Sequence, residues 1–209
     1  MLTFCSHQKQ ALSFMLKRER GWDLRSNEDD IWKSFEDNSK TPTKYFIWIS
    51  REYWWLIPYR YYNALTGFFT RKPPPEFYGG ILADSMGLGK SLTMISLFAS
   101  DYPRQDRGEL RTGIIGENLL IVPLSLLRTW EEQLSHHLHP GTLTWYKYHR
   151  SDRSVHGPTV LGHDIVITTY DVVAAQWRNL EKGMQPLYSR VWRRIILDEG
   201  TFVDVPKVQ

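Results

Sequence analysis

The sequence has almost no cysteine and no long apolar run. Its single Cys5 excludes an internal disulfide and is typical of a reducing compartment such as the cytosol or nucleus. The most apolar window, residues 45–57, is interrupted by Arg51 and Glu52 and is too short to cross a bilayer, so we expect no membrane association. Residues 1–10 lack the basic segment and apolar run of a secretory signal, so we expect none.

A large excess of one charge is also missing. Lysine and arginine number 26 against 23 aspartate and glutamate, a formal net charge of +3 that permits nucleic-acid contact without predicting it. The composition, 42% hydrophobic and 23% charged, is typical of a globular protein. A chain of 209 residues can bury one sizeable core, so we expect one folded domain with an insertion.

Two segments of different character precede the regular part of the chain. Within residues 6–19 the apolar side chains recur at helical spacing, which predicts an amphipathic helix capped at Ser6. Residues 21–78 are rich in tryptophan and tyrosine and end in a run of prolines, so we interpret them as an insertion packed on a core, with the prolines as a stiff connector. Aromatic and arginine side chains at 51–62 are suited to stacking on single-stranded nucleic acid, but aromatic packing within the insertion is favoured.

From residue 79 onward, short apolar runs alternate with helical patterns. The patterns predict helices at 90–99 and 126–138, a loop at 101–117, and strands at 79–83, 118–122, 142–148, 164–168 and 194–197. This alternation predicts an α/β fold with a mostly parallel sheet covered by helices on both faces. Such sheets bind ligands at the carboxyl ends of their strands, and both polar motifs described next fall there.

A glycine-containing loop joins the first predicted strand to the helix at 90–99. Its backbone N–H groups can surround phosphates, and the helix N-terminus adds a positive partial charge. Lys90 is suited to reach the β- and γ-phosphates of a nucleotide, and the Ser91 hydroxyl to coordinate Mg²⁺. Asp84 stands where the strict phosphate-loop pattern has its first glycine; the alternative is a simple glycine turn, but the strand–loop–helix context favours phosphate binding. The predicted nucleotide-binding residues here are Met86, Gly87, Leu88, Gly89, Lys90 and Ser91.

An acidic pair, Asp198-Glu199, directly follows the last predicted strand. A carboxylate at a strand end beside a phosphate loop can hold Mg²⁺, and its neighbour can orient and deprotonate the attacking water. We therefore assign the metal role to Asp198 and the role of general base to Glu199. The alternative is a solvated Asp-Glu pair without a function, and it would be favoured if the acidic pair were the only motif. The phosphate loop upstream favours the functional interpretation.

These residues resemble the ordered motifs of a known family, the Swi/Snf helicase-like ATPases of helicase superfamily two. Residues 79–95 (GGILADSMGLGKSLTMI) resemble its motif I, which tolerates aspartate at the first glycine position. The later matches are residues 118–134 (NLLIVPLSLLRTWEEQL) with motif Ia, 164–170 (DIVITTY) with motif Ib, and 194–200 (RIILDEG) with motif II. His7-Gln8 and the helix that follows resemble the adenine-reading Q motif. The long insertion before motif I resembles the branch that includes the helicase-like transcription factor and its yeast repair relatives.

The resemblance implies a RecA-like lobe that uses ATP and Mg²⁺ in DNA-dependent ATP hydrolysis. It divides the chain into a Q-motif helix at 1–20, a family insertion at 21–78 and the ATP-binding lobe at 79–209, with Gln8 at the adenine edge. It also implies translocation on double-stranded DNA in chromatin remodelling or DNA repair, in the nucleus. Such DNA would be held through its backbone without reading its sequence, and the candidate contacts are Pro123, Ser125, Thr168 and Thr169.

The sequence departs from the family after motif II. Thr201 stands where the family usually has histidine, and residues 202–209 do not match the family's continuation. The family's second lobe is not found in this sequence. That lobe carries an arginine of a kind that raises the rate of phosphoryl transfer by about 10³ to 10⁵. We therefore expect a truncated member, or a gene model ended by a misread splice site, with little or no turnover alone. The alternative function is an inactive nucleotide- or DNA-binding scaffold; a P-loop kinase or GTPase is disfavoured because those folds lack the TTY and DEG strand ends in this order.

Three lesser features have simpler interpretations. Trp130 lies in the motif Ia match, where the family approaches DNA, but its helical spacing favours core packing. His136, His137 and His139 lack partner carboxylates or cysteines at suitable spacing, so metal binding is disfavoured. Cys5 has no evident activating partner except its neighbour His7, and we assign it no role.

Overall fold

The computed structural model describes residues 4–24, 30–34, 61–100, 117–149, 162–183 and 185–200. The chain divides into two compact units, Met1–Asp84 and Ser85–Gln209, which are described separately below. The division between them follows Asp84, and the predicted start of the ATP-binding lobe at residue 79 stays a prediction. The aromatic residues 51–60, nearly all of the predicted loop at 101–117, and Thr201 with the residues after it lie outside the described part.

Helix α1 (Ser6–Arg18) opens the first unit and confirms the predicted N-terminal helix. The predicted cap at Ser6 is wrong, because Ser6 is already helical and Cys5 is the N-cap residue. The Cys5 backbone N–H donates to Gln8 Oε1 at 3.0 Å, so the side chain at the third helical position closes a capping box. This bond occupies one of the N–H groups that a helix start leaves unpaired.

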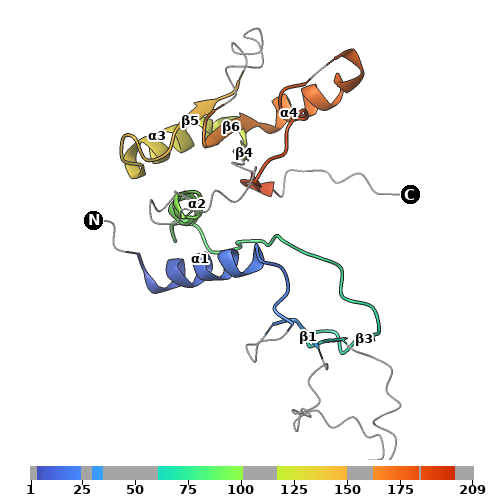
Figure 1. The fold of residues 1–209 in the computed structure, drawn as a ribbon. Coiled ribbons are helices and arrows are strands. Elements are labelled where there is room, and N and C mark those ends of the chain that lie inside the picture. Colours follow the sequence, from blue (N-terminus) through green and yellow to red (C-terminus); the bar gives the residue numbers. More distant parts are fainter. Residues whose placement is uncertain are drawn as a thin grey trace, which may run out of the picture. The chain divides into compact units, whose positions relative to one another are not determined.

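A small antiparallel sheet follows in the first unit, in the order β1-β2-β3 (Figure 1). Its strands are β1 (Trp32–Ser34), β2 (Tyr61–Asn63) and β3 (Phe69–Thr70). The turn between β2 and β3 is held by Asn63, whose Oδ1 accepts the N–H groups of Leu65 and Thr66, each at 3.0 Å. The Tyr62 and Phe69 rings lie 4.7 Å apart across the pair, so aromatic packing holds this sheet.

The strand predicted at 79–83 is wrong. This segment has no regular secondary structure, and the Ile81 side chain is 90% exposed. A β-strand forms only where a neighbouring strand accepts and donates its backbone hydrogen bonds. No strand in the described ranges pairs with this segment, so its apolar residues did not suffice to make it a strand.

The second unit is built on a parallel sheet in the order β5-β6-β4-β7, which confirms the predicted fold class and the four later strands. The strands are β4 (Asn118–Val122), β5 (Trp145–Lys147), β6 (Ile165–Thr169) and β7 (Arg194–Leu197). All residues of β4 and β6 are buried, as their uninterrupted apolar runs predict for the centre of a covered sheet.

Helices cover both faces of this sheet. Helices α2 (Lys90–Ala99) and α3 (Leu127–His137), both predicted, pack on one face, and α4 (Tyr170–Trp177), which was not predicted, packs on the other. The first face buries Ile95, Phe98, Leu120, Val122, Leu127, Trp130, Leu134, Ile165 and Ile167. The second face buries Leu119, Ile121, Tyr148, Val166, Val172 and Leu187. In the part of the chain described here, no helix combines the length and apolarity that crossing a membrane requires.

Candidate functional site: a phosphate loop and a carboxylate in one unit

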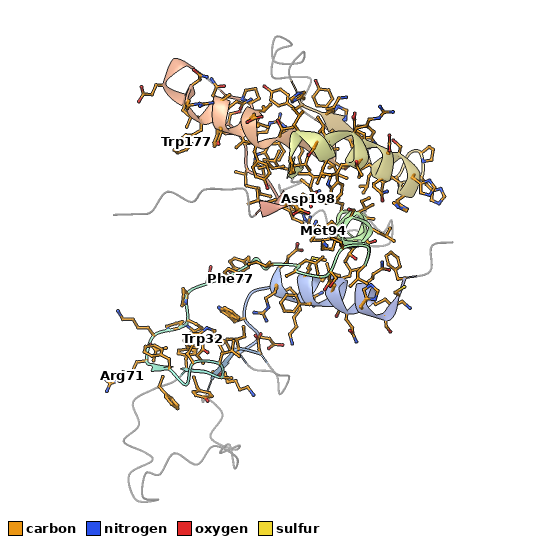
Figure 2. The ribbon with its side chains drawn as sticks, turned by 180° about the vertical axis from the view of Figure 1, so that it is seen from behind. Trp32, Arg71, Phe77, Met94, Trp177 and Asp198 are labelled. Carbon is orange, nitrogen blue, oxygen red and sulfur yellow. The ribbon has the colours of Figure 1, made fainter. Side chains whose placement is uncertain are left out.

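The carboxyl ends of three strands of the second unit meet along one edge of its sheet, called the carboxyl edge below. The register pairs Val122 with Thr169 and Ile121 with Leu197, so β4, β6 and β7 end at nearly the same level. The Asp198 N–H donates to the Ile121 carbonyl at 2.9 Å and so extends the ladder one step beyond β7. Figure 2 shows Asp198 at this end of β7. The parallel topology thus brings motifs far apart in sequence to one edge.

The phosphate loop has the backbone conformation that its glycines predict. Gly87 and Gly89 have φ values of 84° and 78°, a left-handed conformation that side chains with a Cβ rarely adopt. Gly89 is the N-cap of α2, and no side chain caps this helix. The first helical bond of α2 comes from the Thr93 N–H to the Gly89 carbonyl at 3.0 Å. The N–H groups before Thr93 have no helical acceptor and can donate to an anion.

The lysine of this loop turns back over it. Lys90 Nζ donates to the Ser85 carbonyl at 3.2 Å, which holds the ammonium group above the loop backbone. Ser91 follows as the second residue of α2 and is half-buried, while Met86 and Leu88 are exposed, so their contribution to a phosphate site is their backbone. An uncapped helix start, left-handed glycines and a cation on the same turn are chemically suited to a polyphosphate.

The Asp198 carboxylate is held by groups from other elements. Trp130 Nε1, on α3, donates to Asp198 Oδ2 at 2.6 Å, and the Tyr170 hydroxyl, at the start of α4, donates to the Asp198 backbone carbonyl at 2.8 Å. Burial raises the pKa of the Tyr170 phenol, and the nearby charges of Asp198 and then Glu199 raise it further. Tyr170 therefore stays a hydrogen-bond donor at neutral pH.

The chain turns sharply at the second carboxylate. Glu199 is exposed and has a φ of 49°, the only positive φ of a non-glycine residue in the described ranges. For such a residue the left-handed conformation costs about 1 to 2 kcal/mol. Backbone strain of this kind is concentrated at functional sites, where the surrounding structure maintains it. Here the ladder bond and the Tyr170 contact fix the preceding Asp198 on both sides of its Cα.

Trp130 is buried as its helical spacing predicted, with 3% of its surface exposed. The bond from its indole to Asp198 was not predicted, because the two residues are 68 positions apart and no local sequence pattern links them. A signal did exist: the indole N–H is only a donor, so a buried Trp130 requires an acceptor. The sequence could not identify which acceptor that would be.

The four candidate DNA contacts follow β4 or end β6, but their exposure differs. Ser125 is exposed in a short 3₁₀ helix before α3, and Pro123 beside it is half-buried. Thr168 is fully buried, and its hydroxyl donates to the Tyr148 carbonyl at 2.9 Å. Thr169 is also buried, and its hydroxyl has no partner among the groups the structure describes. Ser125 is therefore the candidate whose hydroxyl is open to a ligand.

Gln8 and the three histidines are the remaining candidates. Gln8 belongs to the first unit, is 7% exposed, and uses its carboxamide oxygen to cap α1. An amide oxygen has a second lone pair, so its role at an adenine edge stays a prediction. Burial and then the charge of His136 lower the pKa of His137, whose Nε2 contacts Gln133 Oε1 at 3.1 Å. Within the described ranges, no three histidine, cysteine or acidic side chains gather as a metal centre would require.

Comparison with known proteins agrees with this arrangement. Residues 7–208 match the family described as the SNF2-related domain, so the expectation that residues 202–208 depart from the family is wrong. The chain is 28% identical over 97% of its length to DNA repair protein RAD5B of Arabidopsis thaliana and 31% identical over 93% to DNA repair protein RAD5 of Candida albicans. It is 39% identical over 44% of its length to the helicase-like transcription factor of Oryctolagus cuniculus. These matches span 17%, 21% and 9% of the respective relatives. The chain belongs to the SNF2-related domain family.

Proposed function

We propose that this chain is the ATP-binding lobe of a DNA-dependent ATPase that translocates on double-stranded DNA in the nucleus. One observation supports this most directly. The phosphate loop leads into the start of α2, which no side chain caps, and it belongs to the same folded unit as Asp198, whose carboxylate accepts a hydrogen bond from Trp130 at the carboxyl edge. Membership of the SNF2-related domain family supports the use of ATP and Mg²⁺. Similarity to proteins named for DNA repair supports DNA or chromatin as the partner.

Each residue of the site then has a definite task. The loop backbone from Met86 to Gly89 and the Lys90 ammonium would hold the phosphates, while Gln8 would contact the adenine edge. The Ser91 hydroxyl and the Asp198 carboxylate would hold Mg²⁺, which when bound supplies positive charge that neutralises the transferred phosphoryl group. Glu199 would orient the attacking water and accept its proton.

DNA would bind at the carboxyl edge through its phosphates. Pro123, Ser125, Thr168 and Thr169 are the proposed contacts, and contacts of hydroxyl and backbone N–H groups with phosphates carry no sequence information. Because Thr168 and Thr169 are buried, Ser125 is the proposed contact whose hydroxyl is exposed to a phosphate. Two duplexes of unrelated sequence should therefore bind with equal affinity, and a strong preference for one would contradict this interface.

The nucleotide site is tested by calorimetric titration of the full chain with ATP and Mg²⁺, alongside Lys90→Ala. Charge-assisted hydrogen bonds are worth about 1.5 to 3 kcal/mol, so the variant should bind roughly ten- to a hundredfold more weakly. Lys147→Ala is the matched control, because it removes a lysine of the same unit whose ammonium group pairs with Glu131 at 2.8 Å. Absence of binding to a folded wild type would refute the proposed function, as would equal affinity of the Lys90 variant.

A further inference from the structure

The bond between Trp130 and Asp198 differs from the other indole bonds of the described residues. Trp22 donates to the Pro75 carbonyl at 2.8 Å and Trp192 to the Leu187 carbonyl at 2.7 Å. Backbone carbonyls are available throughout a fold, and they satisfy a buried indole without using a functional group. Trp130 instead donates to a carboxylate at the carboxyl edge, at 2.6 Å.

The indole bond uses only one of the two carboxylate oxygens of Asp198. Asp198 Oδ2 accepts the indole N–H, and no donor in the described part of the chain contacts Oδ1. The backbone of Asp198 is fixed on one side by β4, through the Ile121 carbonyl, and on the other by the Tyr170 hydroxyl. The side chain therefore has one oxygen held by a buried ring and the other left available to a ligand.

The indole is itself held in place, so it can set the orientation of the carboxylate. Trp130 is packed in the first-face cluster with Leu127 and Leu134 of α3 and with strand residues of β4 and β6. A buried ring at close packing cannot rotate without displacing its neighbours. The position of Oδ2 thus depends on how α3 packs against the sheet, and the position of Oδ1 depends on it too.

We propose that Trp130 is a positioning residue for Mg²⁺ binding: its indole N–H fixes Oδ2 of Asp198 and leaves Oδ1 available to hold the metal. The inference rests on the proposed function, because it takes Asp198 as the metal ligand. Groups that orient a metal ligand through a hydrogen bond typically contribute about ten- to a hundredfold to metal affinity. Core packing alone would give Trp130 no influence on Mg²⁺ beyond its effect on stability.

The test is Trp130→Phe in the full chain, which keeps an aromatic ring in the core and removes only the N–H donor and part of the ring. Calorimetry measures ATP binding in EDTA and at a series of free Mg²⁺ concentrations. We expect ATP affinity without Mg²⁺ to be unchanged and the Mg²⁺ concentration at half-maximal enhancement to rise roughly ten- to a hundredfold. Trp192→Phe is the control, because it loses an indole bond to a backbone carbonyl and should leave the Mg²⁺ dependence unchanged.

The outcomes separate the two proposals. An unchanged Mg²⁺ dependence in a folded Trp130→Phe chain overturns the positioning role and leaves the nucleotide site intact. Absence of Mg²⁺-dependent ATP binding in the wild type overturns the proposed function itself. If Trp130→Phe does not fold, nuclear magnetic resonance of the indole N–H groups tests the role instead. The Trp130 resonance is identified as the one that shifts in Asp198→Asn, and in the wild type it should also shift when Mg²⁺ and ATP are added. An indole resonance that ignores Mg²⁺ and ATP overturns the role.

Discussion

Asp30→Asn removes the charge from a buried ion pair in the first unit while keeping the size of the side chain. Asp30 Oδ2 accepts from Arg18 Nη2 at 2.6 Å and from the Asp23 N–H at 3.1 Å, and Oδ1 accepts from the Ile31 N–H at 2.7 Å. Only 7% of the Arg18 side chain and 2% of the Asp30 side chain are exposed. The pair ties the last turn of α1 to the residues before β1, so it supports the helix that carries Gln8.

The expected loss of stability in Asp30→Asn follows from the buried Arg18 charge that the substitution leaves without its carboxylate partner. Arg18 Nε and Nη1 already lack partners among the described groups, and the guanidinium is packed over the Trp22 ring at 4.6 Å. Without the carboxylate, a buried cation would keep this ring, the more distant Phe14 ring at 5.8 Å and the weaker amide oxygen. Breaking a buried pair by removing one charge costs about 3 to 5 kcal/mol, and we expect that loss in the first unit.

The same pair predicts an acid dependence. Although burial alone would raise the pKa of Asp30, hydrogen bonds from Arg18, Asp23 and Ile31 lower it below its usual value of 3.8. A depressed folded-state pKa adds stability above the unfolded pKa, and that stability is lost as the pH falls through the folded value. Wild-type α1 should therefore lose protection below about pH 4, and Asp30→Asn should show a shallower loss there.

Hydrogen exchange followed by mass spectrometry is the assay, because it reports α1 and β1 separately from the second unit. Glu132→Gln is the matched control: it breaks the Arg128–Glu132 pair, whose side chains are 89% and 65% exposed, and should cost about 0.3 to 0.5 kcal/mol. Equal effects of the two substitutions on their own helices, or an unchanged acid slope in Asp30→Asn, would show that the Arg18 pair does not stabilise the first unit.

Two further substitutions probe the second unit. Leu134→Ala leaves a cavity at a fully buried site on the first face of the parallel sheet and should cost about 2 to 5 kcal/mol of stability. Amide protection should fall in β4 and β6 but not in α1, and unchanged protection in β4 and β6 would contradict this core. Gly87→Ala and Gly67→Ala both force a Cβ into a left-handed conformation, at φ values of 84° and 70°, and each should cost about 1 to 2 kcal/mol. Only Gly87→Ala should weaken ATP binding in calorimetry, and equal weakening by both would argue against the phosphate loop.

The elements that were predicted are those whose pattern is local. Strands β4 and β6 are continuous apolar runs between turn signals, and α2 and α3 carry apolar side chains at helical spacing. Helix α4 was missed because it is short and begins directly after β6, so its residues continue an apolar stretch instead of starting a new pattern. The small sheet of the first unit was missed because its strands are only two or three residues long.

Residues 79–83 show the limit of the same reasoning. Their apolar character was sufficient to predict a strand, but a strand also requires a partner, and pairing depends on residues elsewhere in the chain. The opposite case is β7, which forms on β4, yet Ile195 and Leu197 remain 58% and 49% exposed on the face that α4 covers elsewhere. A short apolar run therefore indicates neither pairing nor complete burial by itself.

The sequence alone determined the order of the motifs, the glycines of the phosphate loop and the placement of Asp198 directly after a strand. These features depend on neighbouring residues, which the sequence lists in order. Only the tertiary structure decided that Trp130 donates to Asp198 and that Arg18 pairs with Asp30. A buried donor must find an acceptor, but which acceptor it finds depends on how distant segments pack, and local sequence patterns carry no record of that choice.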